Sequence, residues 1–437
     1  MQRVRAAVLG SMVMVTACEA QKPSVAPPAS APVAVEAPKP PPVVPNTPGP
    51  EFPSETTLLA AQARFSWDMV DGKRVVKPGP ARLVMLSPGE PAWRISLLED
   101  IESNVFHKAI CVGTAQGPRV LTLGGTEALL KLWHVEAGHW QAETLWNPHF
   151  GGKYDRLRDV EIGDVNGDGE PELVIATHDQ GVIAVLTKKP AGGYAVTELN
   201  RSPETFVHEI ELGDLDGNGI PEIYATPSKP NKANTSQSGE VVRFSWDSKK
   251  KRFNRTQAAA FGASHAKEIL VAELDGQAPP ELYAAVESER DAQGGETSPL
   301  KIVRVDPGGK RAFSLYTIAT LPFAVQARVL LVADLTGRGK PEMLVSTMKG
   351  GVWRLIPTPN GEWGKELISK DLTGFENAAG VADMDKDGKP ELYVSGDEQD
   401  VITRLVYNGT SFDRTDLYGM DKSDLTWNLL PCTPEAL

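Results

Sequence analysis

Five short loops in the sequence carry oxygen-bearing side chains at alternating positions. In the first loop, Asp164, Asn166, Asp168 and Glu172 occupy the first, third, fifth and ninth positions, with glycines between them. Oxygen donors spaced along a tight turn can converge on one hard cation, and Ca²⁺ takes about six to eight of them. The loop therefore predicts a calcium site, to which Glu170 adds a backbone carbonyl.

The same pattern returns four times, starting at Asp214, Glu273, Asp334 and Asp383. Two of these copies keep three and four carboxylates, respectively, which is enough to bind a divalent cation. Ile220 and Lys389 supply the backbone carbonyl in these copies. The predicted ligands are Asp214, Asp216, Asn218, Ile220 and Glu222 in one loop, and Asp383, Asp385, Asp387, Lys389 and Glu391 in the other.

The two remaining copies have lost part of the donor set. The loop at Glu273 has Gln277 at its fifth position, so calcium binding there is expected to be weak or absent. The loop at Asp334 has Arg338 at that position, and its guanidinium is expected to replace the cation and pair with Asp334 and Glu342.

An EF-hand and a metal-free turn are the two other interpretations of these loops. An EF-hand needs a Glu at position twelve, where this sequence has Ile175, Ala225 or Val394, so that motif is excluded. A metal-free turn held by hydrogen bonds from Asp and Asn side chains stays open as an alternative. Calcium would be structural in these loops, and nothing in the pattern indicates a catalytic metal.

Short apolar runs rich in Val and Ile flank each loop, which indicates a strand–loop–strand hairpin. Successive loops start 50, 59, 61 and 49 residues apart, a period that fits one four-stranded propeller blade. The five copies resemble the FG-GAP/VCBS repeats of integrin-alpha-like β-propellers, whose signature is close to GDxNGDGxPDL. This resemblance covers roughly Asn104–Leu417, and it departs from the family in having Glu at the ninth position of every copy.

The predicted fold is all-β, a seven-bladed β-propeller, with six or eight blades also compatible with the sequence. Two blades without an acidic loop precede the five that have one. A lone apolar segment, Asp424–Leu430, is expected to serve as the inner strand of the first blade and so close the ring. Closure would bring Cys111 near Cys432, either as a disulfide or as two separate buried thiols.

The N-terminal sequence indicates a targeting segment rather than part of the fold. Basic residues precede an apolar run, and Val15-Thr-Ala-Cys18 looks like a bacterial lipobox, which predicts lipidation of Cys18. The predicted organisation is a lipoprotein signal peptide at 1–17, a Pro/Ala-rich tether at 18–55 and the propeller at 56–437. The expected location is the outer membrane of the cell envelope, on its periplasmic or surface-exposed side.

Charge gives a further set of candidate residues. The net charge of −12 argues against a nucleic-acid partner. Basic side chains nevertheless recur at the start of successive inner strands, and they are predicted to form a recognition surface at the channel mouth opposite the loops. Local pairing with Asp159, Glu209 and Glu268 is the competing interpretation. The predicted binding residues are Lys108, Arg158, His208, Lys267 and Arg328.

The sequence contains no local motif of an enzyme, neither HExxH nor GxSxG nor a phosphate-binding loop. We therefore expect no enzyme but a lipid-anchored propeller that binds a protein or an anionic glycan of the cell envelope. The alternative is a calcium-dependent polysaccharide lyase or hydrolase of the propeller type, because catalytic residues drawn from different blades leave no local motif. The step from fold to function rests on resemblance.

Overall fold

A computed structural model describes residues 51–71, 73–152, 155–230, 237–291, 293, 295–306, 313–358 and 360–437. These residues form strands joined by loops, and none of them lies in a helix that could cross a membrane. The predicted signal peptide, Cys18 and the tether up to residue 50 lie outside the described residues. The all-β prediction is confirmed.

The repeat unit folds as its sequence indicates. The strands β9 (Leu157–Gly163) and β10 (Glu172–Thr177) pair antiparallel, and the first acidic loop joins them. β-Branched and small apolar residues suit a strand covered on both faces. Val174, Ile175 and Ala176 are accordingly fully buried along β10.

Seven sheets of four or five strands make up most of the described chain, together with the two-stranded hairpin of β19 (Glu289–Arg290) and β20 (Glu296–Ser298). We take each larger sheet as a blade. The first contains β2 (Lys73–Pro78), β1 (Leu58–Val70), β3 (Ala81–Ser87), β4 (Arg94–Asp100) and β31 (Asp424–Pro431). The second contains β32 (Glu435–Ala436), β5 (Phe106–Thr114), β6 (Gly117–Gly124), β7 (Leu130–Glu136) and β8 (His139–Trp146).

The five loop-bearing sheets have four strands each, with the acidic loop always between the first strand and the second. The third sheet adds β11 (Ile183–Lys188) and β12 (Tyr194–Asn200) to β9 and β10. The fourth consists of β13 (Phe206–Gly213), β14 (Glu222–Ser228), β15 (Glu240–Asp247) and β16 (Arg252–Ala260). The others are β17 (Ala266–Ala272), β18 (Glu281–Val286), β21 (Leu300–Asp306) and β22 (Ser314–Leu321); β23 (Ala327–Ala333), β24 (Glu342–Thr347), β25 (Gly351–Pro357) and β26 (Trp363–Ser369); and β27 (Ala379–Ala382), β28 (Glu391–Gly396), β29 (Val401–Tyr407) and β30 (Phe412–Gly419).

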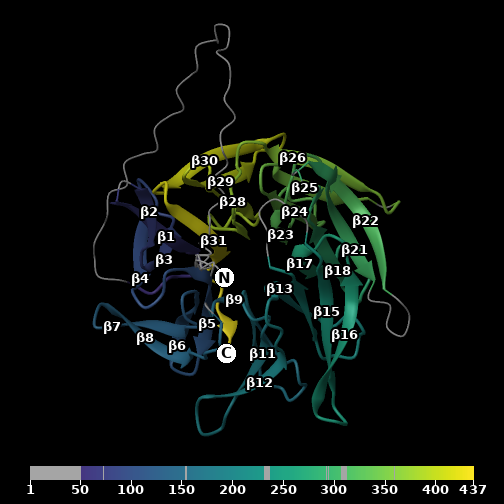
Figure 1. Cartoon of the computed structure of the whole chain (residues 1–437). Helices are drawn as coiled ribbons and strands as arrows, with labels where there is room; N and C mark the ends of the chain where they lie inside the picture. Colours follow the sequence, from purple (N-terminus) through teal and green to yellow (C-terminus); the bar gives the residue numbers. More distant parts are fainter. Residues whose placement is uncertain are drawn as a thin grey trace, which may run out of the picture. The chain divides into compact units, whose positions relative to one another are not determined.

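The inner strands of these sheets contact one another in a closed cycle. In order they are β31, β5, β9, β13, β17, β23 and β27, and the last contacts the first again. Figure 1 shows β31, β5, β9, β13, β17 and β23 around a common centre, with β4, β16, β22, β26 and β30 at the periphery. Seven buried apolar clusters lie between successive sheets, so each sheet buries its faces against its two neighbours. This arrangement is a β-propeller.

The ring closes where the sequence predicts. β31 pairs antiparallel with β1, with Leu430 opposite Leu59, and so supplies the inner strand of the first sheet. Beyond β31 a disulfide joins Cys432 to Cys111 on β5, with 5.0 Å between the two Cα atoms. The alternative of two separate buried thiols is therefore wrong: strand closure places the two sulfurs within bonding reach.

Candidate functional site

The first residue of each acidic loop is held by hydrogen bonds to the loop's own backbone. Asp164 Oδ1 accepts from the amides of Gly167 at 2.7 Å and Asp168 at 3.1 Å, and Oδ2 accepts from Gly169 at 2.8 Å. Asp214, Asp334 and Asp383 accept from the equivalent amides. These contacts are the turn hydrogen bonds of the metal-free interpretation.

The ninth-position Glu begins the second strand and, in most of the loops, accepts a hydrogen bond from a backbone amide of the loop. Glu172 is fully buried, and its Oε2 accepts from the Val165 amide at 3.1 Å. Glu222, Glu281 and Glu391 accept from the amide at the same position of their own loops. Burial raises the pKa of Glu172 to about 7, and the nearby Asp168 and Asp164 carboxylates act in the same direction.

In the loop at Asp214, an arginine on the third strand donates hydrogen bonds to the ninth-position Glu and to a second carboxylate. Arg243 on β15 donates from Nη2 to Asp216 Oδ2 at 2.6 Å and also to Glu222 Oε1. In the last loop Arg404 on β29 makes the same two contacts, with Asp385 and Glu391. A guanidinium therefore lies between the third-position and ninth-position carboxylates, where a bound cation would have to lie.

Arginines also contact the two loops that have lost part of the donor set. Arg354 on β25 donates to Glu342 Oε2 at 3.2 Å, and Arg338 donates to Glu342 Oε1. The predicted pairing of Arg338 with Glu342 is confirmed, whereas toward Asp334 the residue offers only its backbone amide, at 2.9 Å. In the loop at Glu273, Arg304 forms an ion pair with Asp275, at 3.4 Å, and with no other described carboxylate of the loop.

These third-strand arginines were not predicted. They share one register position, opposite the residue two places after the ninth-position Glu: Arg243 pairs with Tyr224, Arg304 with Tyr283, Arg354 with Leu344 and Arg404 with Tyr393. The signal was a single Arg inside an otherwise apolar strand in four of the five repeats. In the first repeat the same register position is Val185, opposite Val174.

The carboxylates of two loops are gathered closely enough for a metal ion. Oxygen atoms of Asp383, Asp385 and Glu391 lie within 4.8 Å of one another, and so do those of Glu273, Asp275 and Glu281. In the loop at Asp383 the Arg404 guanidinium bridges two of these carboxylates, which accounts for their proximity. The loop at Glu273, expected to bind weakly, gathers more acidic ligands than its sequence suggested.

The basic residues of the predicted channel mouth occur on the inner strands, and most of them have partners. Lys108 Nζ lies 2.8 Å from Asp159 Oδ1 and 2.7 Å from Glu161 Oε1. Lys267 lies 3.3 Å from Glu287, and Arg328 lies 3.4 Å from Glu376.

The other two predicted binding residues have no ion pair with any described residue. Burial lowers the pKa of His208 well below its ordinary value, so this side chain is neutral. The Arg158 guanidinium lies over the Trp427 ring, and it acts on the Glu209 and Glu268 carboxyl groups without forming an ion pair with either. The mouth is thus less positively charged than the sequence pattern suggested.

Acidic residues one position further along tie neighbouring inner strands together. Asp159 Oδ2 accepts from the Ile210 amide on β13 at 2.8 Å, and Glu268 Oε1 accepts from the Leu330 amide on β23 at 3.1 Å. The central cavity, about 300 Å³, is lined by six carboxylates and by three permanently charged cations, Lys108, Arg158 and Arg328. It is therefore predominantly acidic.

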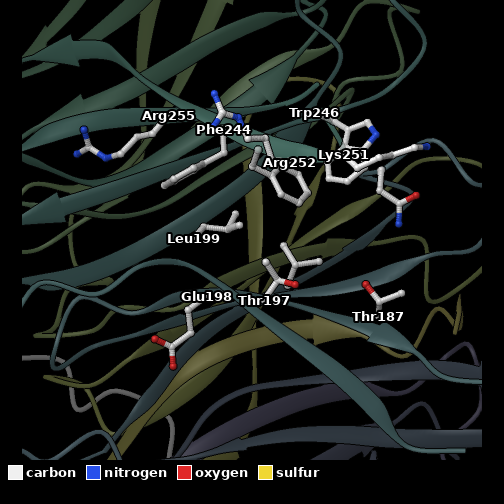
Figure 2. A pocket seen from close by; sticks show the side chains of 12 residues that line it. Thr187, Thr197, Glu198, Leu199, Phe244, Trp246, Lys251, Arg252 and Arg255 are labelled. Carbon is white, nitrogen blue, oxygen red and sulfur yellow. The ribbon is translucent and has the colours of Figure 1, made fainter. Parts of the chain in front are cut away.

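A second cavity of about 330 Å³ lies between the third and fourth sheets. Figure 2 shows its two walls, with Thr187, Thr197, Glu198 and Leu199 from β11 and β12 facing Phe244, Trp246, Arg252 and Arg255 from β15 and β16. We call this cavity the interblade groove. Trp246 packs on Phe253 with ring centroids 4.9 Å apart. Asn166 of the first acidic loop lines the groove next to Val185 and Thr187.

Some charged side chains of the interblade groove form ion pairs, and others form none with any described residue. Arg255 pairs with Glu240 at 2.5 Å, and Glu198 pairs with Arg201 at 2.5 Å. Lys251 and Arg252 are exposed and form no ion pair with any residue that the structure describes. The Trp246 Nε1 donor is buried without a hydrogen-bond partner among those residues. The groove thus combines aromatic surface, hydroxyl groups and free positive charge, which sequence reasoning missed because two sheets build it.

Comparison with known proteins supports the repeat and the fold. The family described as FG-GAP-like repeat matches residues 132–225, which confirms the predicted resemblance for that part of the chain. A search of curated protein sequences gives no match.

Two solved structures are similar to this chain to different degrees. A putative 6-phosphogluconolactonase from Bacteroides uniformis is 13% identical with a TM-score of 0.50, covering 85% of this chain and 96% of its own. A lectin from Agrocybe aegerita that recognises non-reducing terminal N-acetylglucosamine is 12% identical with a TM-score of 0.35, covering 76% of this chain and 97% of its own. At 13% identity the likeness to the first of these structures concerns the fold alone.

Proposed function

We propose that this protein is a lipid-anchored binding module of the cell envelope, which presents a calcium-stiffened β-propeller to an anionic glycan. The interblade groove is the observation that carries this proposal. Its volume of about 330 Å³ lies at the lower end of the range of small-ligand pockets. A rigid propeller holds both walls of the groove in place, as a binding site requires.

The chemistry of the groove favours an acidic sugar over an apolar ligand. The faces of Trp246 and Phe253 offer flat apolar surface of the kind that covers the C–H face of a sugar ring. Thr187 and Thr197 offer hydroxyl groups that donate and accept hydrogen bonds. Lys251 and Arg252 would attract a carboxylate or sulfate on the sugar.

We place the binding site here and not at the channel mouth, since Lys108, Lys267 and Arg328 already have acidic partners there. The anchor at Cys18 and the outer-membrane location remain part of the proposal, and they rest on the lipobox-like sequence. Calcium is expected to be structural, with no catalytic role.

The test compares binding of an oligogalacturonate with binding of a neutral galacto-oligosaccharide of equal length to the full chain in detergent. Trp246→Ala should weaken oligogalacturonate binding by about tenfold or more, and Arg252→Glu should weaken it and reduce its salt dependence. Tyr407→Ala is the matched control, because Tyr407 packs on Phe412 at the corresponding place of another sheet, with centroids 5.3 Å apart. Equal affinity for the neutral sugar, or equal losses in Trp246→Ala and Tyr407→Ala, would refute the groove as an anionic-glycan site.

One observation favours the second candidate, a polysaccharide lyase or hydrolase. Burial raises the pKa of Glu268 to about 8, and it raises those of Glu209 and Glu211 well above their ordinary range. Carboxyl groups with raised pKa values beside Lys108 in a cavity can exchange protons near neutral pH. Release of reducing ends from polygalacturonate, lost in Glu268→Gln, would support this candidate over simple binding.

A further inference from the structure

We propose that, of the three loops whose sequences predict calcium, only the Asp164 loop takes the cation, and that Arg243 and Arg404 replace it in the Asp214 and Asp383 loops. The assignment does not depend on the glycan of the proposed function. It follows from which residue the third strand places beside each loop.

The donor sets of the three loops are nearly alike, so the loops alone do not separate them. Each has carboxylates at the first and ninth positions, and an Asp or Asn at the third and fifth. What differs is the counter-charge. Arg243 bridges Asp216 and Glu222, and Arg404 bridges Asp385 and Glu391, so a guanidinium already lies between two of the carboxylates that would bind calcium and offsets one negative charge of each loop.

Displacing either arginine would be costly. Arg243 and Arg404 side chains are 15% and 21% exposed, and each shares its guanidinium with a Glu that is at most 2% exposed. A cation entering the loop would leave that guanidinium buried without its acidic partner. The two loops therefore do not fit calcium, although their sequences match the repeat.

The Asp164 loop lacks this counter-charge. Val185 occupies the register position of the arginine, and no described cation forms an ion pair with Asp164, Asp168 or Glu172. Val185 lines the interblade groove together with Asn166 and Thr187. Asn166 donates from Nδ2 to Glu172 Oε1 in this structure. Rotation of its amide group by a half turn would give a set of three carboxylates, one amide oxygen and the Glu170 carbonyl, which suits a hard cation.

The experiment uses the full chain in mild detergent, with calcium binding measured by titration calorimetry and by the melting temperature. Calcium should raise the melting temperature of the wild type by about 2–4 °C. Asp168→Asn should abolish this rise, while the matched change in the last loop, Asp387→Asn, should leave it intact. Equal losses in both variants would overturn the assignment.

Exchanging the third-strand residue gives an independent test. Val185→Arg should remove the calcium response, and Arg404→Gln should add a second binding event in the loop at Asp383. If Val185→Arg fails to fold, Arg404→Gln still decides, because a titration unchanged from wild type would show that the arginine does not exclude the cation. Sugar binding is not needed in any of these measurements, so failure here is distinct from failure of the proposed function.

Discussion

The guanidinium of Arg158 lies over the Trp427 ring, 5.3 Å from its centroid, and so connects β9 to the strand that closes the ring. Arg158 forms no ion pair within the described residues, and its buried Nε has no hydrogen-bond partner there. The Trp427 ring is therefore a direct contact of this charge, and the Glu209 and Glu268 carboxyl groups of the same cavity add a longer-range attraction.

A double-mutant cycle should detect this contact. Arg158→Met, Trp427→Leu and the double variant are expected to show a coupling free energy of about 1–2 kcal/mol, the range of partly desolvated cation–π pairs. Urea unfolding of the four proteins measures it. Additive single changes would mean that the stacking contributes nothing beyond packing.

Acid should destabilise the fold through His178. Burial lowers its pKa to about 4, and the Arg156 guanidinium acts in the same direction. An unfolded imidazole titrates near about 6.5, so the unfolded chain binds more protons between these pH values, and the free energy of unfolding falls as the pH is lowered through this window.

His178→Gln should therefore lose less stability than the wild type between about pH 7 and pH 4.5, by on the order of 1–2 kcal/mol. Chemical denaturation at both pH values provides the measurement. Glu268, whose pKa burial raises to about 8, changes stability with the opposite sign, but it is common to both proteins and cancels in the comparison. An equal acid-induced loss in both proteins would show that His178 is not responsible.

The disulfide should stabilise the closed ring. It links residues separated by 321 positions, and removing a cross-link over a long loop costs roughly 2–5 kcal/mol. Cys432→Ser should lower the urea midpoint accordingly, and a reducing agent should bring the wild type to the same value. The variant itself serves as the control, because its midpoint should not respond to the reducing agent.

The proposed anchor predicts a simple change in partitioning. Cys18→Ser should leave the protein in the aqueous phase of a detergent phase separation, since the acyl chains of a lipoprotein are what retain it in the detergent phase. The wild type should be recovered with the detergent. If both proteins partition alike, residue 18 is not lipidated.

The sequence was sufficient for features that depend on local patterns. Gly and Asp at fixed spacing identify the hairpins around Asp164 and Asp383, and the lone segment Asp424–Leu430 indicates ring closure by β31. It was insufficient where partners come from distant positions. The bridging arginines follow the first loop residue by 20 to 31 positions, so their contact with the loops depends on strand register.

The charge pattern of the inner strands shows a related limit. Lys108 recurs in phase with Arg158 and Arg328, which suggested one positive field, yet the structure places Asp159 and Glu161 of the adjacent strand beside it. The spacing of residues along the sequence shows which of them occupy the same position on successive inner strands. It does not show which acidic residues of the adjacent strand pair with these basic side chains.

The position of Cys111 also determines how the molecule would respond to mechanical tension. The outer strands of the first sheet, β1, β3 and β4, precede Cys111, whereas their inner partner β31 lies before Cys432 and within the cross-linked segment. A load pulling from the N-terminal side enters at β1 and can separate these strands from β31 by breaking hydrogen bonds and apolar contacts, without breaking a covalent bond. It then meets a covalent bond, beyond which the other six sheets share one closed chain. The first sheet would thus yield under force while the rest of the propeller stays folded.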